Sequence, residues 1–211
     1  KFRSIFHSLV LFALILTIPS VVRSNIWWFH PDSLTFLFVT LTLMFLQLDQ
    51  FRLGRNFIPA AIACGMSIAI KLLGLFFFLS IPLYLFIGLI KKQYDFKKGI
   101  HFAIIFILIM VFVVVFTNPF LWYEAPRMAM IERQASKQDE IKHGYTHGNP
   151  STYQKGPEWW DWTIKTSFGP PYYLFFLAIS LVAGSLWGEN RLSNILIMSW
   201  SFPFLFMSYT L

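Results

Sequence analysis

The sequence predicts an all-α fold, a polytopic transmembrane helical bundle, from three observations. Hydrophobic residues make up 56% of the 211 residues and charged residues only 13%, which is too few charges to cover a water-soluble globule. Several apolar runs approach the roughly 20 residues that a helix needs to cross a hydrocarbon core of about 30 Å. Short segments rich in lysine and arginine separate these runs and alternate along the chain.

The apolar runs predict about seven crossings. They are Ser4 to Val22, Leu34 to Phe51, Phe57 to Ile70, Leu73 to Ile90, Lys98 to Thr117, Pro171 to Trp187 and Leu192 to Leu211. The third and fourth form one run of 34 residues, which is too long for a single span, so we expect a hairpin turn at Lys71 and Gly74. Residues 1–117 and 171–211 then form the bundle, with a short external loop at 23–33 and a long one at 118–170.

Lysine and arginine in short loops indicate the cytoplasmic side, because these residues resist translocation. Nine of the 17 basic residues fall on every second loop: Lys1, Arg3, Arg52, Arg55, Lys91, Lys92, Lys97, Lys98 and Arg191. The short loops of the other face hold only Arg23 and Lys71, while residues 118–170 contain six basic and six acidic residues. The net charge of +7 is therefore a topology signal, and we expect membrane lipids but no nucleic acid as partners.

The remaining global features bear on packing and location. The one cysteine, Cys64, lies among alanine and glycine in an apolar run, which favours a role in helix packing and excludes a disulfide within this chain. The sequence begins at Lys1 and ends inside an apolar run at Leu211, so we expect a fragment with membrane sequence missing at both ends. The compact loops favour a prokaryotic plasma membrane over the endoplasmic reticulum.

The stretch NIWWFHPDSLTFLF places an acid at the external membrane surface. Asp32 and Ser33 stand where a helix cap belongs, because a short polar side chain there accepts hydrogen bonds from the free N–H groups of the first turn. The alternative is that Asp32 and its neighbour His30 bind a polar ligand or a cation. Both interpretations remain open.

Lys71 lies inside the 34-residue apolar run. A lysine at the centre of a membrane costs about 2.5–3.5 kcal/mol unless it reaches the interface or meets an anion. The predicted topology puts Lys71 at the external tip of the hairpin, where it can snorkel to lipid head groups. It can also bind the phosphate of a lipid-linked substrate, because a flexible ammonium is a good point-charge partner for phosphate.

The long loop offers weaker signals. His143 and His147 are four residues apart, but glycines follow both of them and disfavour the helix that such a metal-binding pair needs. No cofactor is therefore predicted, and use of a divalent metal is undetermined. The tryptophan-rich stretch PEWWDWTIKTSFG predicts an interfacial helix. Tyr123, Glu124 and Arg127 follow the NPF turn outside and are candidates to line an external cavity.

Three other polar positions have simple interpretations. Asn118 and Pro119 are expected to stop a helix, because proline cannot continue one. Asp49 ends the second crossing on the cytoplasmic side, and Asp95 lies among lysines in KKQYDFKKG. Both aspartates are expected to be solvated charges.

A family resemblance rests on two stretches. The first begins with FHPDSLTFLF and reaches IAIKLLGLFFF about forty residues later, and the second is VVVFTNPFLWY. The chain resembles the GT-C membrane glycosyltransferases, specifically the protein O-mannosyltransferase-like glycosyltransferase family 39, which also holds the lipid A aminoarabinose transferases. The shared pattern is an external PD that opens a helix, a helix that ends at a lysine, and NPF leaving a later helix. Each motif is short, and together they span most of the 211 residues.

The resemblance implies an enzyme that transfers a sugar from a polyprenyl or dolichyl phosphate carrier to a protein or lipid acceptor on the extracytoplasmic side. It implies that Asp32 and His30 contact the sugar or the acceptor and that Lys71 contacts the carrier phosphate. The catalytic aspartate of the family lies in the first external loop, expected upstream of Lys1, so its position is unknown here. The alternatives are a transporter or flippase, whose charges would mark a path at the midplane, and a non-catalytic membrane subunit.

Overall fold

The computed structural model describes residues 9, 13, 31–71, 73–143, 171–187 and 191–210, and every element in these ranges is helical. The elements are α3 (Pro31–Asp49), α4 (Phe57–Lys71), the 3-10 helix η2 (Leu73–Phe76), α5 (Phe77–Ile90), α6 (Phe96–Thr117), the 3-10 helix η3 (Pro119–Trp122), α7 (Glu124–His143), α9 (Pro171–Trp187) and α10 (Arg191–Thr210). The all-α prediction is confirmed for this part of the chain. The first predicted crossing lies outside it, apart from helical positions 9 and 13.

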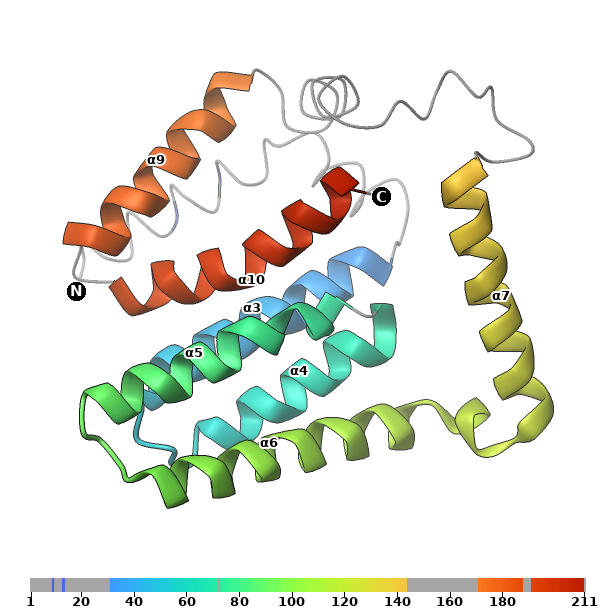
Figure 1. The fold of residues 1–211 in the computed structure, drawn as a ribbon, viewed down its shortest axis with the longest axis horizontal. Helices are drawn as coiled ribbons and strands as arrows, with labels where there is room; N and C mark the ends of the chain where they lie inside the picture. The colour runs from blue at the N-terminus through green and yellow to red at the C-terminus, as the bar shows by residue number, and fades with distance from the viewer. Residues whose placement is uncertain are drawn as a thin grey trace.

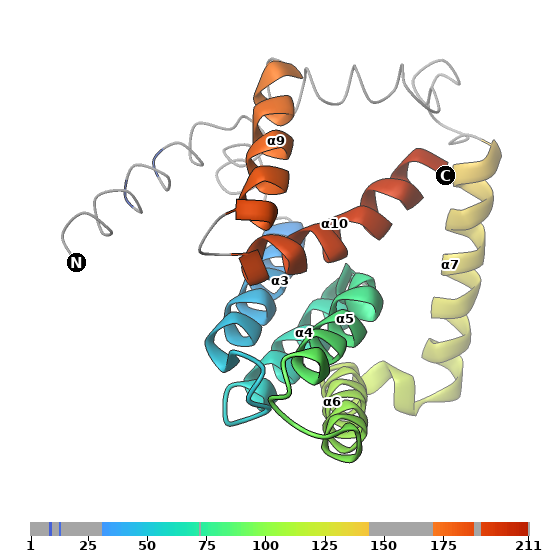
Figure 2. The same cartoon turned by 60° about the vertical axis from the view of Figure 1, so that its left-hand side comes forward.

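Helix α4 lies at the centre of the bundle, between α3 and α6, while α10 covers α3 and α5 and α9 packs on α10 (Figures 1 and 2). The buried face of α4 is rich in small residues, which let neighbouring helix backbones approach closely. At Gly65, an added Cβ would lie 2.9 Å from the carbonyl oxygen of Met110 on α6. Cys64 is only 1% exposed in the same interface, so its predicted packing role is confirmed.

The helices alternate in direction, which gives the bundle two chemically different ends (Figure 1). The basic end comprises the loops 50–56 and 91–95 together with the starts of α6 and α10. Its basic residues, all exposed, are Arg52, Arg55, Lys91, Lys92, Lys97, Lys98 and Arg191. The opposite end comprises the start of α3, the turn around η2 and the end of α6, from which α7 projects.

One described helix, α6, is long and apolar enough to cross a membrane. Its 22 residues include an 18-residue apolar window of which only 11% is buried, so it does not resemble the core helix of a soluble protein. Such a large exposed apolar surface favours contact with lipid or with another apolar partner. Helices α4, α5 and α9 have 15, 14 and 17 residues, fewer than the roughly 20 of a full span, so seven crossings remain a prediction.

The 34-residue apolar run divides where the sequence predicts. Helix α4 ends at Lys71, and η2 turns the chain into α5. A Cβ on Gly74 would lie 2.7 Å from the carbonyl oxygen of Cys64 and would collide with the Ser67 side chain. A glycine is therefore required at this position for η2 to pack directly on α4.

Asp49 is buried, and the expectation that it is a solvated charge is wrong. Its carboxylate is 3% exposed and accepts hydrogen bonds of 2.8 Å from the backbone N–H groups of Leu53 and Gly54 and from the hydroxyl of Tyr84. The Tyr84 hydroxyl in turn accepts the N–H of Phe51 at 2.6 Å. A buried carboxylate needs such a set of donors to replace lost hydration.

The same bonds hold a tight loop after α3. Gln50, Phe51 and Leu53 adopt positive φ angles of 52°, 62° and 51°, in a region that costs non-glycine residues about 1–2 kcal/mol each. The Phe51 ring stacks on Tyr84 with 4.7 Å between centroids, and the Lys91 ammonium lies 4.8 Å from the Phe51 centroid. Ring packing and the carboxylate together offset the backbone strain.

Two differences concern the segment that enters and leaves α6. Asp95 is exposed as expected, but it also caps α6, because its side chain accepts the N–H of Lys98 at 3.3 Å. The first part of the predicted loop 118–170 folds into η3 and the 20-residue α7. Helix α7 is rich in alanine, methionine, glutamate, arginine and lysine. These residues have high helix propensity, so the segment forms a helix although it has no apolar stripe.

We predict that Gly74→Ala destabilises the fold by about 1–3 kcal/mol, because η2 must move away from α4 to make room for the methyl group. The measurement is denaturant unfolding in detergent micelles. Gly54→Ala is the matched control, since its Cβ would meet only a carboxylate oxygen of Asp49 at an ordinary 3.6 Å. Equal stability of the two variants would contradict the close packing at Gly74.

We predict that Tyr84→Phe lowers the free energy of unfolding by about 1–3 kcal/mol, because it deprives a buried carboxylate and a buried N–H of their shared partner. Thermal unfolding followed by circular dichroism measures this loss. Tyr123→Phe removes the same hydroxyl from an exposed side chain and is expected to change stability by less than about 0.5 kcal/mol. A Tyr84→Phe protein as stable as this control would show that the Asp49 bonds contribute little.

Candidate functional site

The structure gathers the elements of the predicted site at the opposite end of the bundle (Figure 1). His30 lies outside the described residues. Asp32 is the second residue of α3, because the helix begins at Pro31, a residue whose fixed φ suits a first helical position. Asp32 therefore lies inside the first turn and not before the helix, where a cap would stand. An acid in this turn is favoured by the positive end of the helix dipole.

Lys71 is the last residue of α4, and its side chain is exposed. It directly precedes the turn into η2, which packs against α3, α4, α5 and α10. The elements that hold Asp32 and Lys71 therefore converge on η2, although the two residues are separated by 39 positions in the sequence. A basic residue in the last turn also complements the negative end of the α4 dipole.

An apolar groove is lined in part by the C-terminal half of α4. It has a volume of about 460 Å³ and runs between α4, α5 and α6, with Cys64, Ile68 and Gly74 among its lining residues. Cys64, Ile68 and position 71 are spaced i, i+4 and i+7 along α4, so they share one stripe of that helix. Lys71 thus continues, toward the helix end, the stripe that forms one wall of the groove.

Tyr123, Glu124 and Arg127 lie at the corner where η3 turns into α7, and all three are exposed. Arg127 donates its backbone N–H to the carbonyl of Tyr123 at 3.2 Å, and its guanidinium reaches the carbonyl of Leu121 at 3.5 Å. These contacts fix the corner. The residues lining the apolar groove belong to other segments, so the prediction that the corner lines a cavity is not supported by this groove.

Asn118 ends α6, as the sequence predicts. Its side-chain amide donates to the carbonyl of Val114 at 2.8 Å, and Pro119 opens η3 directly after it. The indole N–H of Trp122 donates to the carbonyl of Val115 at 3.0 Å. Side chains of the turn thus bond two of the last carbonyls of α6, which the helix itself cannot satisfy.

The described residues of this end include the basic side chains Lys71 and Arg127 and the acids Asp32 and Glu124, and the apolar groove is lined by α4, η2, α5 and α6. Among the residues that the structure describes, no three His, Cys, Asp or Glu side chains form a cluster that could hold a metal ion. His143 is the last residue of α7, and His147, the second histidine of the predicted pair, lies outside the described residues. The buried Asp49 belongs to the basic end, away from this region.

Neither the sequence nor the fold matches a known family model, a curated protein or a solved structure. The assignment of a function to this end of the bundle therefore depends on its residues and on the motif resemblance.

Proposed function

We propose that the chain is the membrane part of a glycosyltransferase that takes a sugar from a polyprenyl phosphate carrier and passes it to a protein or lipid acceptor. The observation that supports the proposal is the position of Lys71 at the end of α4, on the same helical stripe as Cys64 and Ile68, which line the apolar groove. A carrier lipid has this same order of chemistry, with a phosphate joined to a long apolar chain. A basic residue next to an apolar groove suits such an amphipathic donor.

The groove and Lys71 would bind different parts of the carrier lipid. The apolar walls would hold the isoprenoid chain, and the Lys71 ammonium would neutralise the charge that develops on the departing phosphate. The acceptor hydroxyl also needs a base to remove its proton, and the resemblance places that residue upstream of Lys1. Asp32 would orient the sugar or the acceptor, together with His30.

The proposed sidedness follows from charge. The basic end would face the cytoplasm, so that Lys71, Asp32 and the corner with Tyr123, Glu124 and Arg127 would face the extracytoplasmic side. Exposed apolar side chains on α3, α5, α6, α9 and α10 support a multi-pass arrangement in a bilayer. We favour a prokaryotic plasma membrane because the loops at the basic end are short.

The distribution of charge favours a transferase over a transporter. In the described helices of the bundle, the charged residues lie in the first or last turns: Asp32, Asp49, Lys71, Lys97, Lys98 and Arg191. A transport path would place ionisable groups near the midplane of the membrane. The charged residues of the described bundle helices therefore lie at the two ends of the bundle, and none lies near its middle.

The proposal predicts that Lys71→Met abolishes sugar transfer while the protein remains folded in detergent, and that Lys71→Arg keeps part of the activity because the charge is retained. The assay reconstitutes the full-length gene product in liposomes with radiolabelled polyprenyl-phosphate sugar and a mixed acceptor extract. Lys92→Met, which removes an exposed lysine at the basic end, is the control and should transfer normally. Equal transfer by all four proteins would reduce Lys71 to a residue that anchors the helix at the membrane surface.

Asp32→Asn tests the sugar-orienting role in the same assay. Asparagine keeps a polar side chain in the first turn of α3 but removes the charge, so transfer should fall while the unfolding temperature changes little. Unchanged transfer would show that Asp32 only stabilises the first turn of α3 and does not orient the sugar. Absence of transfer by the folded wild-type protein with every donor would contradict the proposed activity itself.

A further inference from the structure

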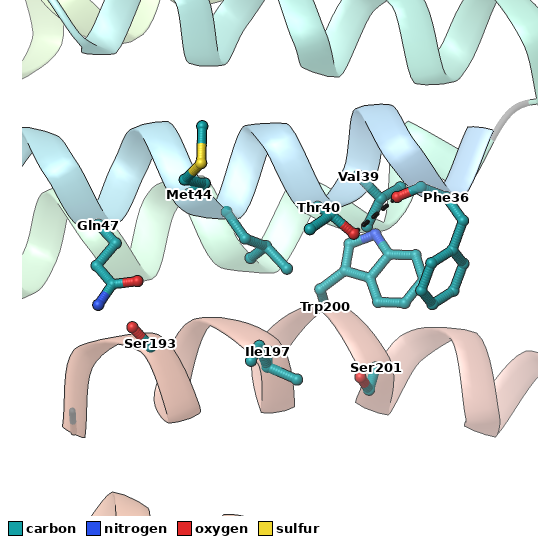
Figure 3. Close-up of a pocket in the computed structure, with 10 residues that line it drawn as sticks. Phe36, Val39, Thr40, Met44, Gln47, Ser193, Ile197, Trp200 and Ser201 are labelled. Carbon is teal, nitrogen blue, oxygen red and sulfur yellow. Dashed lines mark hydrogen bonds between the residues drawn. The ribbon is translucent and has the colours of Figure 1, made fainter. Parts of the chain in front are cut away.

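A second groove, of about 330 Å³, separates α3 from α10 (Figure 3). On α3 it extends from Phe36 to Gln47, and on α10 from Ser193 to Ser201. Eleven residue steps along a helix correspond to about 16 Å, roughly half of the hydrocarbon thickness of a bilayer. The groove therefore has the length of one membrane leaflet.

Polar groups lie at one end of this groove. Figure 3 shows the amide of Gln47 and the hydroxyl of Ser193 pointing toward one another across it. The Ser193 hydroxyl oxygen is buried and has no hydrogen-bond partner in the described part of the chain. Buried polar groups are nearly always hydrogen-bonded, so this hydroxyl indicates a partner that is not part of the described chain.

The rest of the groove is largely apolar, with Thr40 and Ser201 as its other hydroxyl side chains. Met44, Ile197 and Trp200 line it, and Trp200 meets the edge of Phe36 with 6.3 Å between ring centroids. The hydroxyl of Thr40 turns back to the Phe36 carbonyl at 2.8 Å, as Figure 3 shows, so it offers its proton to its own helix. An occupant therefore needs hydrogen-bonding groups at the Gln47 end and an apolar body beyond them.

The Gln47 end of the groove lies at the basic end of the bundle. Ser193 is the third residue of α10, and the exposed Arg191 is the first. Arg191 thus lies within one helical turn of Ser193, and from the amide and hydroxyl pair the groove continues along about 16 Å of mainly apolar wall. A glycerophospholipid has this order of groups, with a phosphate, an ester carbonyl and an acyl chain.

We propose that this groove binds one anionic glycerophospholipid from the leaflet at the basic end. The ester carbonyl accepts hydrogen bonds from Ser193 and Gln47, the phosphate pairs with Arg191, and one acyl chain lies along Trp200. The carbonyls of a partner helix already accept hydrogen bonds within that helix, whereas a lipid ester carbonyl is free to accept the Ser193 hydroxyl. The site is separate from the proposed transfer site, which lies at the opposite end.

Native mass spectrometry of the full-length protein in detergent tests the proposal. The probes are equimolar palmitoyl-oleoyl phosphatidylglycerol and the matching phosphatidylcholine, and the wild type should retain one phosphatidylglycerol in preference. The double variant Gln47→Leu with Ser193→Ala should retain about tenfold less lipid, because two hydrogen bonds are lost. Gln93→Leu with Ser185→Ala makes the same chemical changes outside the groove and should bind like wild type.

Arg191→Gln gives an independent readout that does not depend on the core packing. It should keep a bound lipid but lose the preference for phosphatidylglycerol, whereas Arg55→Gln, another exposed arginine at the basic end, should keep it. Equal lipid retention and equal preference in every variant would mean non-specific binding and would overturn the proposal. A co-purified polypeptide in place of lipid, lost in the Gln47 and Ser193 variant, would overturn it as well.

Discussion

The buried bond between the Asp49 carboxylate and the Tyr84 hydroxyl determines how the helices meet at the basic end. A carboxylate at the C-terminus of a helix is disfavoured by the helix dipole, and burial makes it costlier still. It is retained because two backbone N–H groups and one phenol replace its water. The Tyr84 ring also stacks against Phe51 and Phe57, so this one side chain connects α3, the strained loop, α4 and α5.

The Asp49–Tyr84 bond explains where the polar and apolar groups lie along the bundle. With the loops fixed at the basic end, the alternating helices bring the start of α3 and the turn around η2 together at the other end, where Lys71 extends the stripe of α4 that lines an apolar groove. The second groove opens between α3 and α10, with its polar groups toward the basic end. Each groove is largely apolar and is lined by a helix that has a basic residue at one end, Lys71 on α4 or Arg191 on α10, which is consistent with the two sites proposed for amphipathic molecules.

The sequence predicted what depends on local pattern. Run lengths gave α4, α5, α6 and α9 to within a few residues, and Lys71 together with Gly74 located the hairpin. The role of Asp49 was missed because its partner Tyr84 lies 35 residues away in an apolar run, although an acid at a helix C-terminus was a signal. Helix α7 was missed because it has no apolar periodicity, and the α3–α10 groove because helices distant in sequence form it.

Membrane sidedness is the central claim, and cysteine labelling in intact cells tests it most directly. Cys64 is 1% exposed, so single cysteines introduced at the exposed positions Arg55 and Glu132 report on the basic end and on α7. A membrane-impermeant maleimide should label the Glu132→Cys protein from outside and the Arg55→Cys protein only after permeabilisation. Labelling of both from the same side, or the reverse order, would contradict the proposed topology and the position of the site.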